Sequence, residues 1–196
     1  MLAMLLGLVL TVPAQAQTPD VRALFEAGSY RQVVDAVAGL PSPDPATLYL
    51  GALSHQKLGD PGSAKPWLAR LASMPDADPW HLIGQSAVAI AEGRTADALA
   101  PAKKATEAAP GLLFAHFQHG LALAGNQDYV ASAAAFEQVV SADPRSAYGH
   151  YYAGLAYSRF KRVDKMAAHF EAFLKLAPNA PERAEVSSIM RTVRGR

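Results

Sequence analysis

The sequence predicts an all-α protein built as a solenoid of antiparallel helix pairs. Three observations lead to this prediction. Unrelated residue types recur with a period of 34 residues, the clearest repeats contain two stripes with helical spacing, and a proline closes three of the repeats. Several residue types that share one period rarely arise by chance, and a period of this length is typical of repeat architectures.

The N-terminal element is an apolar run with the features of an export signal. Residues 2–12 form an apolar segment of 11 residues, which is short for a bilayer span of about 20 residues. Ala14-Gln15-Ala16 then supplies the small-x-small pattern that a signal peptidase requires. We therefore expect residues 1–16 to be a signal peptide cleaved after Ala16, which leaves a bacterial protein, periplasmic or secreted, without stable membrane insertion. The alternative is a buried first helix.

The 34-residue period is clearest in the second half of the chain. Prolines with this separation are Pro110, Pro144 and Pro178, and aromatic residues with the same separation are Trp80, Phe114 and Tyr148. Within residues 147–180, one stripe at i, i+3, i+4 and i+7 comprises His150, Ala153, Gly154 and Tyr157. After a polar break, a second stripe comprises Met166, Phe170, Phe173 and Leu174. Because proline cannot continue a helical hydrogen-bond ladder, this unit is predicted to be two helices joined by a turn.

These features resemble the tetratricopeptide repeat. That repeat has a small residue in its first helix, a Tyr-like residue three positions later, a Gly-Asp-Tyr-like turn, an aromatic residue in its second helix and a closing proline. The positions that match are Gly154, Tyr157, Phe170 and Pro178, and, in the preceding unit, Gly120, Asp128, Tyr129, Phe136 and Pro144. The resemblance implies a curved solenoid in which stacked repeats jointly bury their apolar faces.

The resemblance divides the chain into four repeats at residues 45–78, 79–112, 113–146 and 147–180. The earlier two are degenerate, with Ala52 and Ser86 where glycine is usual. Residues 17–44 are expected to be a partial N-terminal repeat, because Gly28-Ser29-Tyr30 is similar to the family turn. Residues 181–196 are expected to be a C-terminal capping helix, with an apolar stripe of Val186, Ile189, Met190 and Val193.

Two prolines fall inside predicted second helices. Pro66 lies three residues after Ser63, so a helix capped by Ser63 would place the missing N–H among groups that are unpaired anyway. Pro101 lies deeper in its helix, where we expect a kink.

The resemblance further implies that the first helix of each repeat lines a concave groove. The residues expected there are Tyr49, Leu53, Trp80, Ile83, Phe114, Phe117, Leu121, Tyr148, Tyr151, Tyr152 and Leu155. Aromatic side chains bury large areas at low entropic cost, which suits a protein or peptide partner. Lys57 and Arg159 lie near the rim without the Asn set of those family members that grip a C-terminal carboxylate, so an apolar segment is the expected ligand. The alternative is that these rings only pack between helices.

The charge distribution is uneven although the net charge is only +1, which argues against nucleic-acid binding. Residues 145–196 contain 10 Lys and Arg against 4 Asp and Glu, a balance of +6. This end could meet an anionic partner or lipid headgroups, or could simply be a solvated edge. The absence of cysteine excludes disulfides, thiol nucleophiles and thiolate zinc sites.

No motif of an enzyme is present, since nucleophile-elbow, dinucleotide-loop, phosphate-loop and H-E-x-x-H patterns are all missing. His116 and His119 are three residues apart on one predicted helix, and His150 lies one repeat later, so together they could ligate a metal. The alternative is that these histidines bond to neighbouring groups at helix interfaces. Because this arrangement is the more common one, we expect the protein to bind no metal and no cofactor.

Together these observations predict a non-enzymatic, exported scaffold. It would bind a protein or peptide segment in the aromatic groove and aid assembly of an envelope or secretion complex. The alternatives are a self-associating structural protein, because solenoid ends can continue across chains, and a histidine-based metal-binding protein.

Overall fold

The computed structural model describes residues 20–194, so the predicted signal peptide at residues 1–16 lies outside the described part. Within that part the chain forms eleven helices and no strands. Their bounds are α1 Val21–Glu26, α2 Tyr30–Ala38, α3 Pro45–Lys57, α4 Pro61–Ala72, α5 Pro79–Ala91, α6 Thr95–Ala108, α7 Leu113–Gly125, α8 Tyr129–Ala142, α9 Ala147–Arg159, α10 Val163–Leu176 and α11 Arg183–Arg194. None of these helices has the length and apolarity needed to cross a membrane.

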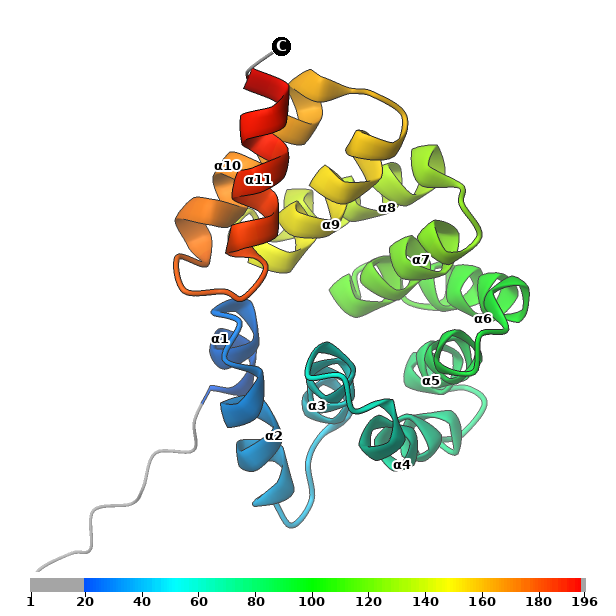
Figure 1. The fold of residues 1–196 in the computed structure, drawn as a ribbon. Helices are drawn as coiled ribbons and strands as arrows, with labels where there is room; N and C mark the ends of the chain where they lie inside the picture. The colour runs from blue at the N-terminus through cyan, green and yellow to red at the C-terminus, as the bar shows by residue number, and fades with distance from the viewer. Residues whose placement is uncertain (1–19, 195–196) are drawn as a thin grey trace, which may run out of the picture.

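The helices pack as successive pairs that curve around a common centre. Each helix contacts the next one along the chain, and α3, α5, α7 and α9 face inward while α4, α6, α8 and α10 lie outside them (Figure 1). The ranges 45–78, 79–112, 113–146 and 147–180 each contain one such pair, and α1–α2 and α11 flank them. The prediction of an all-α tetratricopeptide-type solenoid is confirmed.

The same turn joins the two helices of every pair, including the short first pair. Each turn contains one residue in the left-handed region, with φ between 62° and 76°: Gly28, Gly59, Gly93, Gln127 and Lys161. In the third repeat, for example, the Asp128 N–H following this residue donates to the Leu123 carbonyl at 3.0 Å. Glycine adopts this conformation at no steric cost, whereas Gln127 and Lys161 are held there by the surrounding repeat.

Small residues allow the paired helices to approach closely. A Cβ atom placed on Gly154 would lie 2.5 Å from the ring of Phe170, and one placed on Gly120 would lie 2.7 Å from the ring of Phe136. Both rings are almost completely buried. The aromatic residue of the second helix therefore occupies the space that the glycine leaves in the first helix.

The expected Ser63 cap is wrong, because α4 begins earlier. Asp60 is the cap, its carboxylate accepts a hydrogen bond from the Ser63 N–H at 3.1 Å, and Pro61 occupies the first turn. Aspartate is among the best N-cap residues and proline suits the first helical position, so this start is favoured over one at Ser63. Pro66 consequently lies inside α4, as Pro101 lies inside α6.

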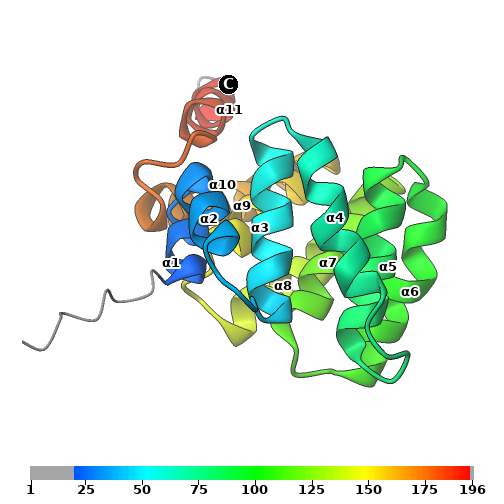
Figure 2. The ribbon, with the colours of Figure 1, turned by 90° about the horizontal axis from the view of Figure 1, so that it is seen from below.

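The two ends of the array meet. The α1–α2 pair lies beside α9 and the α10–α11 connection in both views (Figures 1 and 2). At Gly28 an added Cβ would come within 2.8 Å of the Ala180 Cα, so these segments are in direct contact. α11 packs on α10 and buries Val186 and Met190, whereas the side chain of Val193 lies outside the described part.

Candidate protein-binding surface

The residues expected in the groove lie on helices α3, α5, α7 and α9, and they differ in exposure. Six are buried, with at most 8% of their surface exposed: Tyr49, Leu53, Ile83, Phe117, Tyr148 and Tyr151. Five are half-buried: Trp80, Phe114, Leu121, Tyr152 and Leu155. In this closed arrangement, only the second group offers appreciable surface to a partner.

Two aromatic groups account for much of this burial. Tyr49 contacts the rings of Trp80 and Phe114, with centroid distances of 6.1 and 5.7 Å, and its hydroxyl donates to the Gln118 side-chain oxygen at 2.6 Å. In the later repeats Tyr152 stacks on Phe136, with centroids 5.4 Å apart. The inner residues thus pack across repeats, because aromatic pairs at these distances contribute beyond their buried area.

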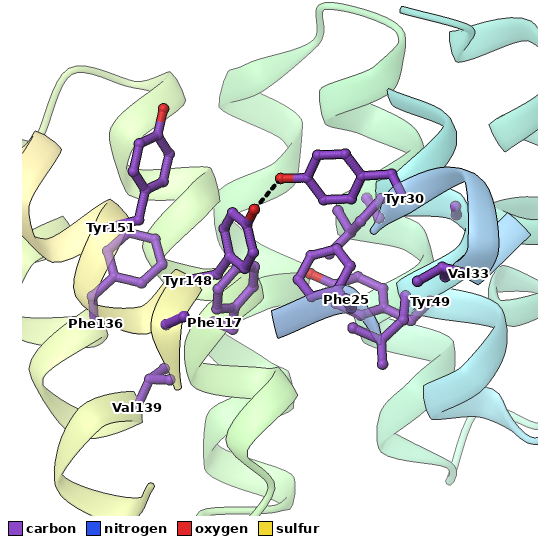
Figure 3. Packing of buried hydrophobic residues seen from close by; sticks show 14 of the residues in the cluster. Phe25, Tyr30, Val33, Tyr49, Phe117, Phe136, Val139, Tyr148 and Tyr151 are labelled. Carbon is purple, nitrogen blue, oxygen red and sulfur yellow. Dashed lines mark hydrogen bonds between the residues drawn. The ribbon is translucent and has the colours of Figure 1, made fainter. Parts of the chain in front are cut away.

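The N-terminal pair covers the inner face of the last repeat. Phe25 places its ring 4.9 Å from that of Tyr148, and the hydroxyls of Tyr30 and Tyr148 are hydrogen-bonded (Figure 3). The Glu26 carboxylate accepts hydrogen bonds from the Tyr148 N–H and the Ser146 hydroxyl, each at 3.0 Å. Burial raises the pKa of Glu26 even though these hydrogen bonds act in the opposite direction.

An ion pair joins α3 to the start of α11 across the centre of the array. The Lys57 Nζ lies 3.0 Å from the Glu182 carboxylate, and both side chains are largely buried. The same ammonium lies 4.8 to 5.4 Å from the ring centroids of Tyr148, Tyr151 and Tyr152. Cation–π attraction of this kind strengthens when the charge is removed from water.

The pKa shifts of this ion pair follow from its surroundings. Burial alone would lower the pKa of Lys57, but interactions with Tyr152 and Glu182 outweigh it and raise the pKa above its ordinary value. Burial would raise the pKa of Glu182, yet the hydrogen bond from Tyr30 and the charge of Lys57 hold it below its ordinary value. The pair is therefore ionised at neutral pH and ties the two ends of the array together.

Two openings among the described residues share lining residues of the inner helices α7 and α9. One has a volume of about 270 Å³ and is lined by Phe25, Leu53, Gln56, Lys57, Ile90, Leu121 and Tyr152. The other, which we call the α7–α9 crevice, has a volume of about 310 Å³ and is lined by Leu121, Ala124, Gly125, Tyr129, Ser132, Phe136, Tyr152, Leu155, Ala156 and Arg159. Leu121 and Tyr152 line both openings, so the two openings adjoin at α7 and α9.

His116 and His150 contact backbone carbonyl groups. The Nε2 atoms of His116 and His150 lie 2.8 and 3.2 Å from the carbonyl oxygens of Pro110 and Pro144, which is the same contact in two successive repeats. His150 Nδ1 also lies 3.0 Å from His169 Nδ1, and His169 in turn contacts Glu137 at 3.2 Å. Burial, followed by repulsion from His116, lowers the pKa of His119. Across residues 20–194 no group of three His, Asp or Glu residues is arranged to hold a metal ion.

Sequence reasoning missed the residues that close the array. The sequence pattern places Tyr30 only in a predicted turn and gives no role to Glu26, Gln118 or Glu182. Gln118 could have been found, because it lies on the first helix of its repeat, 34 residues before Tyr152, which was expected in the groove. Its amide nitrogen donates to the Ser86 hydroxyl at 2.9 Å, so it links α5 and α7.

Comparison with known proteins identifies the fold. No model of a protein family and no curated protein matches the sequence. Among solved structures, TTC0263, a thermophilic TPR protein of Thermus thermophilus, shares 21% identity over 82% of this chain and 88% of its own, with a TM-score of 0.58. YrrB, a TPR protein with an unusual peptide-binding site, shares 20% identity over 81% of this chain and 84% of its own, with a TM-score of 0.51.

A double mutant of MamA from RS-1 gives a similar result, with 20% identity over 86% of this chain and 98% of its own and a TM-score of 0.51. At these identities the likeness concerns the fold alone. It agrees with the recurring helix pairs, the repeated turn and the glycine–aromatic contacts described above. The chain therefore has the tetratricopeptide-repeat fold.

Proposed function

We propose that this protein is an exported, non-enzymatic scaffold that binds a segment of another protein on the inner surface of its repeats. The observation that carries this proposal is the pair of openings centred on Leu121 and Tyr152. Both are lined mainly by apolar side chains, of which Ile90, Leu121, Tyr152 and Leu155 are half-buried. YrrB, which has a similar fold, is a TPR protein with a peptide-binding site, and this supports a peptide or protein ligand here.

Export is part of the proposal and rests on the sequence of residues 1–16, with cleavage after Ala16. In the periplasm such a scaffold would act by holding components together, so that affinity and geometry are its mechanism. A role in assembling an envelope or secretion complex fits this mode of action. No catalytic chemistry is needed.

The contact between the two ends of the array favours partner binding over self-association. An open solenoid end could continue into a second copy of the chain. Here α1–α2 contacts α9 and the α10–α11 connection, so both ends are already occupied within one chain. End-to-end stacking would first have to break the Lys57–Glu182 ion pair and the contacts of Tyr30.

The test is capture of partners by the full chain, exported in its host and tagged at the C-terminus. The test variant is Leu121→Gln with Leu155→Gln, which makes the inner surface polar. Its matched control is Val130→Gln with Val163→Gln, which alters two apolar residues that are 63% and 45% exposed and line neither opening. Circular dichroism establishes that each variant remains helical.

We expect a specific protein to be retained by the parent and the control and lost from the test variant. Retention of the same proteins by all three would contradict binding at the inner surface. A second copy of the chain as the retained species, with a dimer in light scattering, would favour self-association instead.

A further inference from the structure

The α7–α9 crevice combines a small apolar volume with one charged side chain at its rim. Its volume of about 310 Å³ is at the lower end of the range for ligand sites, which is roughly 300–1,000 Å³. Gly125, Ala124 and Ala156 contribute little or no side chain to its walls, whereas Leu121 and Leu155 present aliphatic groups. The space therefore suits one large apolar side chain.

Arg159 is the charged residue that lines the crevice. Its guanidinium carbon lies 5.6 Å from the centroid of the Tyr129 ring, which orients the group without using its N–H donors for an ion pair. Among the described residues no carboxylate lies within ion-pair distance of Arg159. By contrast, the nearby Arg162 is paired with Asp164 at 3.1 Å, and Lys165 lies 3.9 Å from Glu137.

Basic residues also follow α9 in the sequence, while Asp128, which precedes the lining residue Tyr129, is engaged as the N-cap of α8. Lys161 is exposed at the turn that follows α9, and residues 145–196 carry a balance of +6. A guanidinium binds carboxylates through two parallel hydrogen bonds, and an unpaired one on an aromatic face is ready to do so. A basic or neutral segment would leave this charge without a partner.

We propose that the α7–α9 crevice docks an acidic segment of a partner protein, with one large apolar side chain in the crevice and a flanking carboxylate on Arg159. This inference rests on the proposed function, since it specifies the partner chemistry for that surface. Affinity comes from burial of the apolar side chain, while the charge selects the segment and increases the rate of association. Because the charge pair is at the rim, added salt weakens binding.

The probe is an array of synthetic decapeptides with a central Leu, Phe, Tyr or Trp. In one set the flanking positions are Asp and Glu, in a second set they are Asn and Gln, and in a third set they are Lys and Arg. The strongest acidic peptide is then titrated against the full chain by fluorescence anisotropy. Arg159→Glu is the test variant. Arg70→Glu, on α4 at the far side of the array, makes the same change in charge at an exposed arginine (Figure 1).

We expect acidic peptides to bind about tenfold more tightly than their amide counterparts, and Arg159→Glu to reduce that binding about tenfold. Arg70→Glu should change it less than twofold. Thermal unfolding should change only slightly in both variants, because each arginine lies in the last turn of its helix and neither is in an ion pair with a described residue. Arg159→Glu additionally loses the contact with the Tyr129 ring.

Equal binding of acidic and neutral peptides, equal effects of the two arginine variants, or no binding to any acidic peptide would overturn the inference. So would Arg159-dependent binding to vesicles of phosphatidylglycerol in place of the peptides. The proposed function fails separately: if capture of a partner depends on Leu121 and Leu155 while the array shows no acidic preference, only the docking inference is lost.

Discussion

One methyl group added at Gly84 should force α4 and α5 apart. Gly84 is buried on α5, where the second repeat stacks on the first. A Cβ atom there would lie 2.3 Å from the backbone nitrogen of Ala72 and 2.6 Å from the carbonyl carbon of Leu71. These are main-chain atoms of the α4 terminus, so no side-chain rotation can make room.

The size of the effect follows from these distances. Ordinary Cβ contacts begin at 3.4 Å, so the obstacle at 2.3 Å must retreat by about 1.1 Å. Overpacking of this kind costs typically 1–3 kcal/mol and sometimes more, and alanine regains about 1 kcal/mol of helix propensity. We expect Gly84→Ala to lower the free energy of unfolding by about 2 kcal/mol, which lowers Tm by roughly 4–8 °C for a chain of this size.

The matched control is Gly62→Ala in the first turn of α4. The nearest atom to an added Cβ at Gly62 is the Asp60 Oδ1 at 3.7 Å, an ordinary contact, and its φ is not in the left-handed region. This substitution should stabilise the protein by about 0.5 kcal/mol through helix propensity. Far-ultraviolet circular dichroism melts of both variants test the prediction. Equal Tm values for the two would refute the stacking of α5 on α4 described here.

Three further predictions concern the closure of the array, the repeated turn and pH. Phe25→Ala should lower the free energy of local unfolding of the α1–α2 pair by about 3 kcal/mol. Hydrogen exchange should then accelerate in residues 20–40 while α5–α8 remain protected, and uniform acceleration would contradict this expectation. Gln127→Gly should raise the free energy of unfolding by about 0.5–1 kcal/mol, because glycine adopts φ 63° without strain. Urea titrations measure this change, and an unchanged midpoint would contradict the strain at Gln127. Burial, aided by the neighbouring His169, lowers the pKa of His150 below 6.5, while Glu137 and Asp143 act oppositely. The folded state therefore binds fewer protons than the unfolded state below about pH 6.5, and stability falls as the pH decreases through this window. In the His150→Gln variant, stability should therefore fall less between about pH 7.5 and pH 5.5 than in the parent protein. An equal fall in both proteins would show that other groups cause the pH dependence.

The repeats could be predicted from the sequence because each one encodes its own local structure. Pro110, Pro144 and Pro178 follow the ends of α6, α8 and α10, and the residue before each proline is pushed out of the helical region. Gly120 and Gly154 recur opposite Phe136 and Phe170 at the same period. Such contacts lie within one repeat, so spacing along the chain is enough to reveal them.

The closure of the array could not be predicted in this way. Tyr30 and Tyr148 are 118 residues apart, and Lys57 and Glu182 are also far apart in sequence. Whether they meet depends on the small rotation added at each repeat, which accumulates over the whole array. For the same reason the sequence indicated which side chains face inward, but not that Tyr49, Ile83 and Tyr148 would be fully buried there.

The candidate site is therefore partly foreseen. Leu121, Tyr152 and Leu155 were expected in the groove and line the α7–α9 crevice. Tyr129 and Ser132 come from the second helix of their repeat and were not expected there. They line the crevice because the residues of α7 and α9 beside them, Ala124, Gly125 and Ala156, have small side chains or none. The 34-residue period of the sequence does not reveal this packing.

Binding of another protein on the inner surface is tested most directly by site-specific photocrosslinking in living cells. A photoreactive amino acid is placed at Leu155, on the inner surface, and in a second strain at Arg70, on the exposed face of α4. If the inner surface binds another protein, illumination should give a discrete adduct with that protein from the Leu155 position and none from Arg70. The same adducts from both positions, or only a dimer of this chain, would contradict the account.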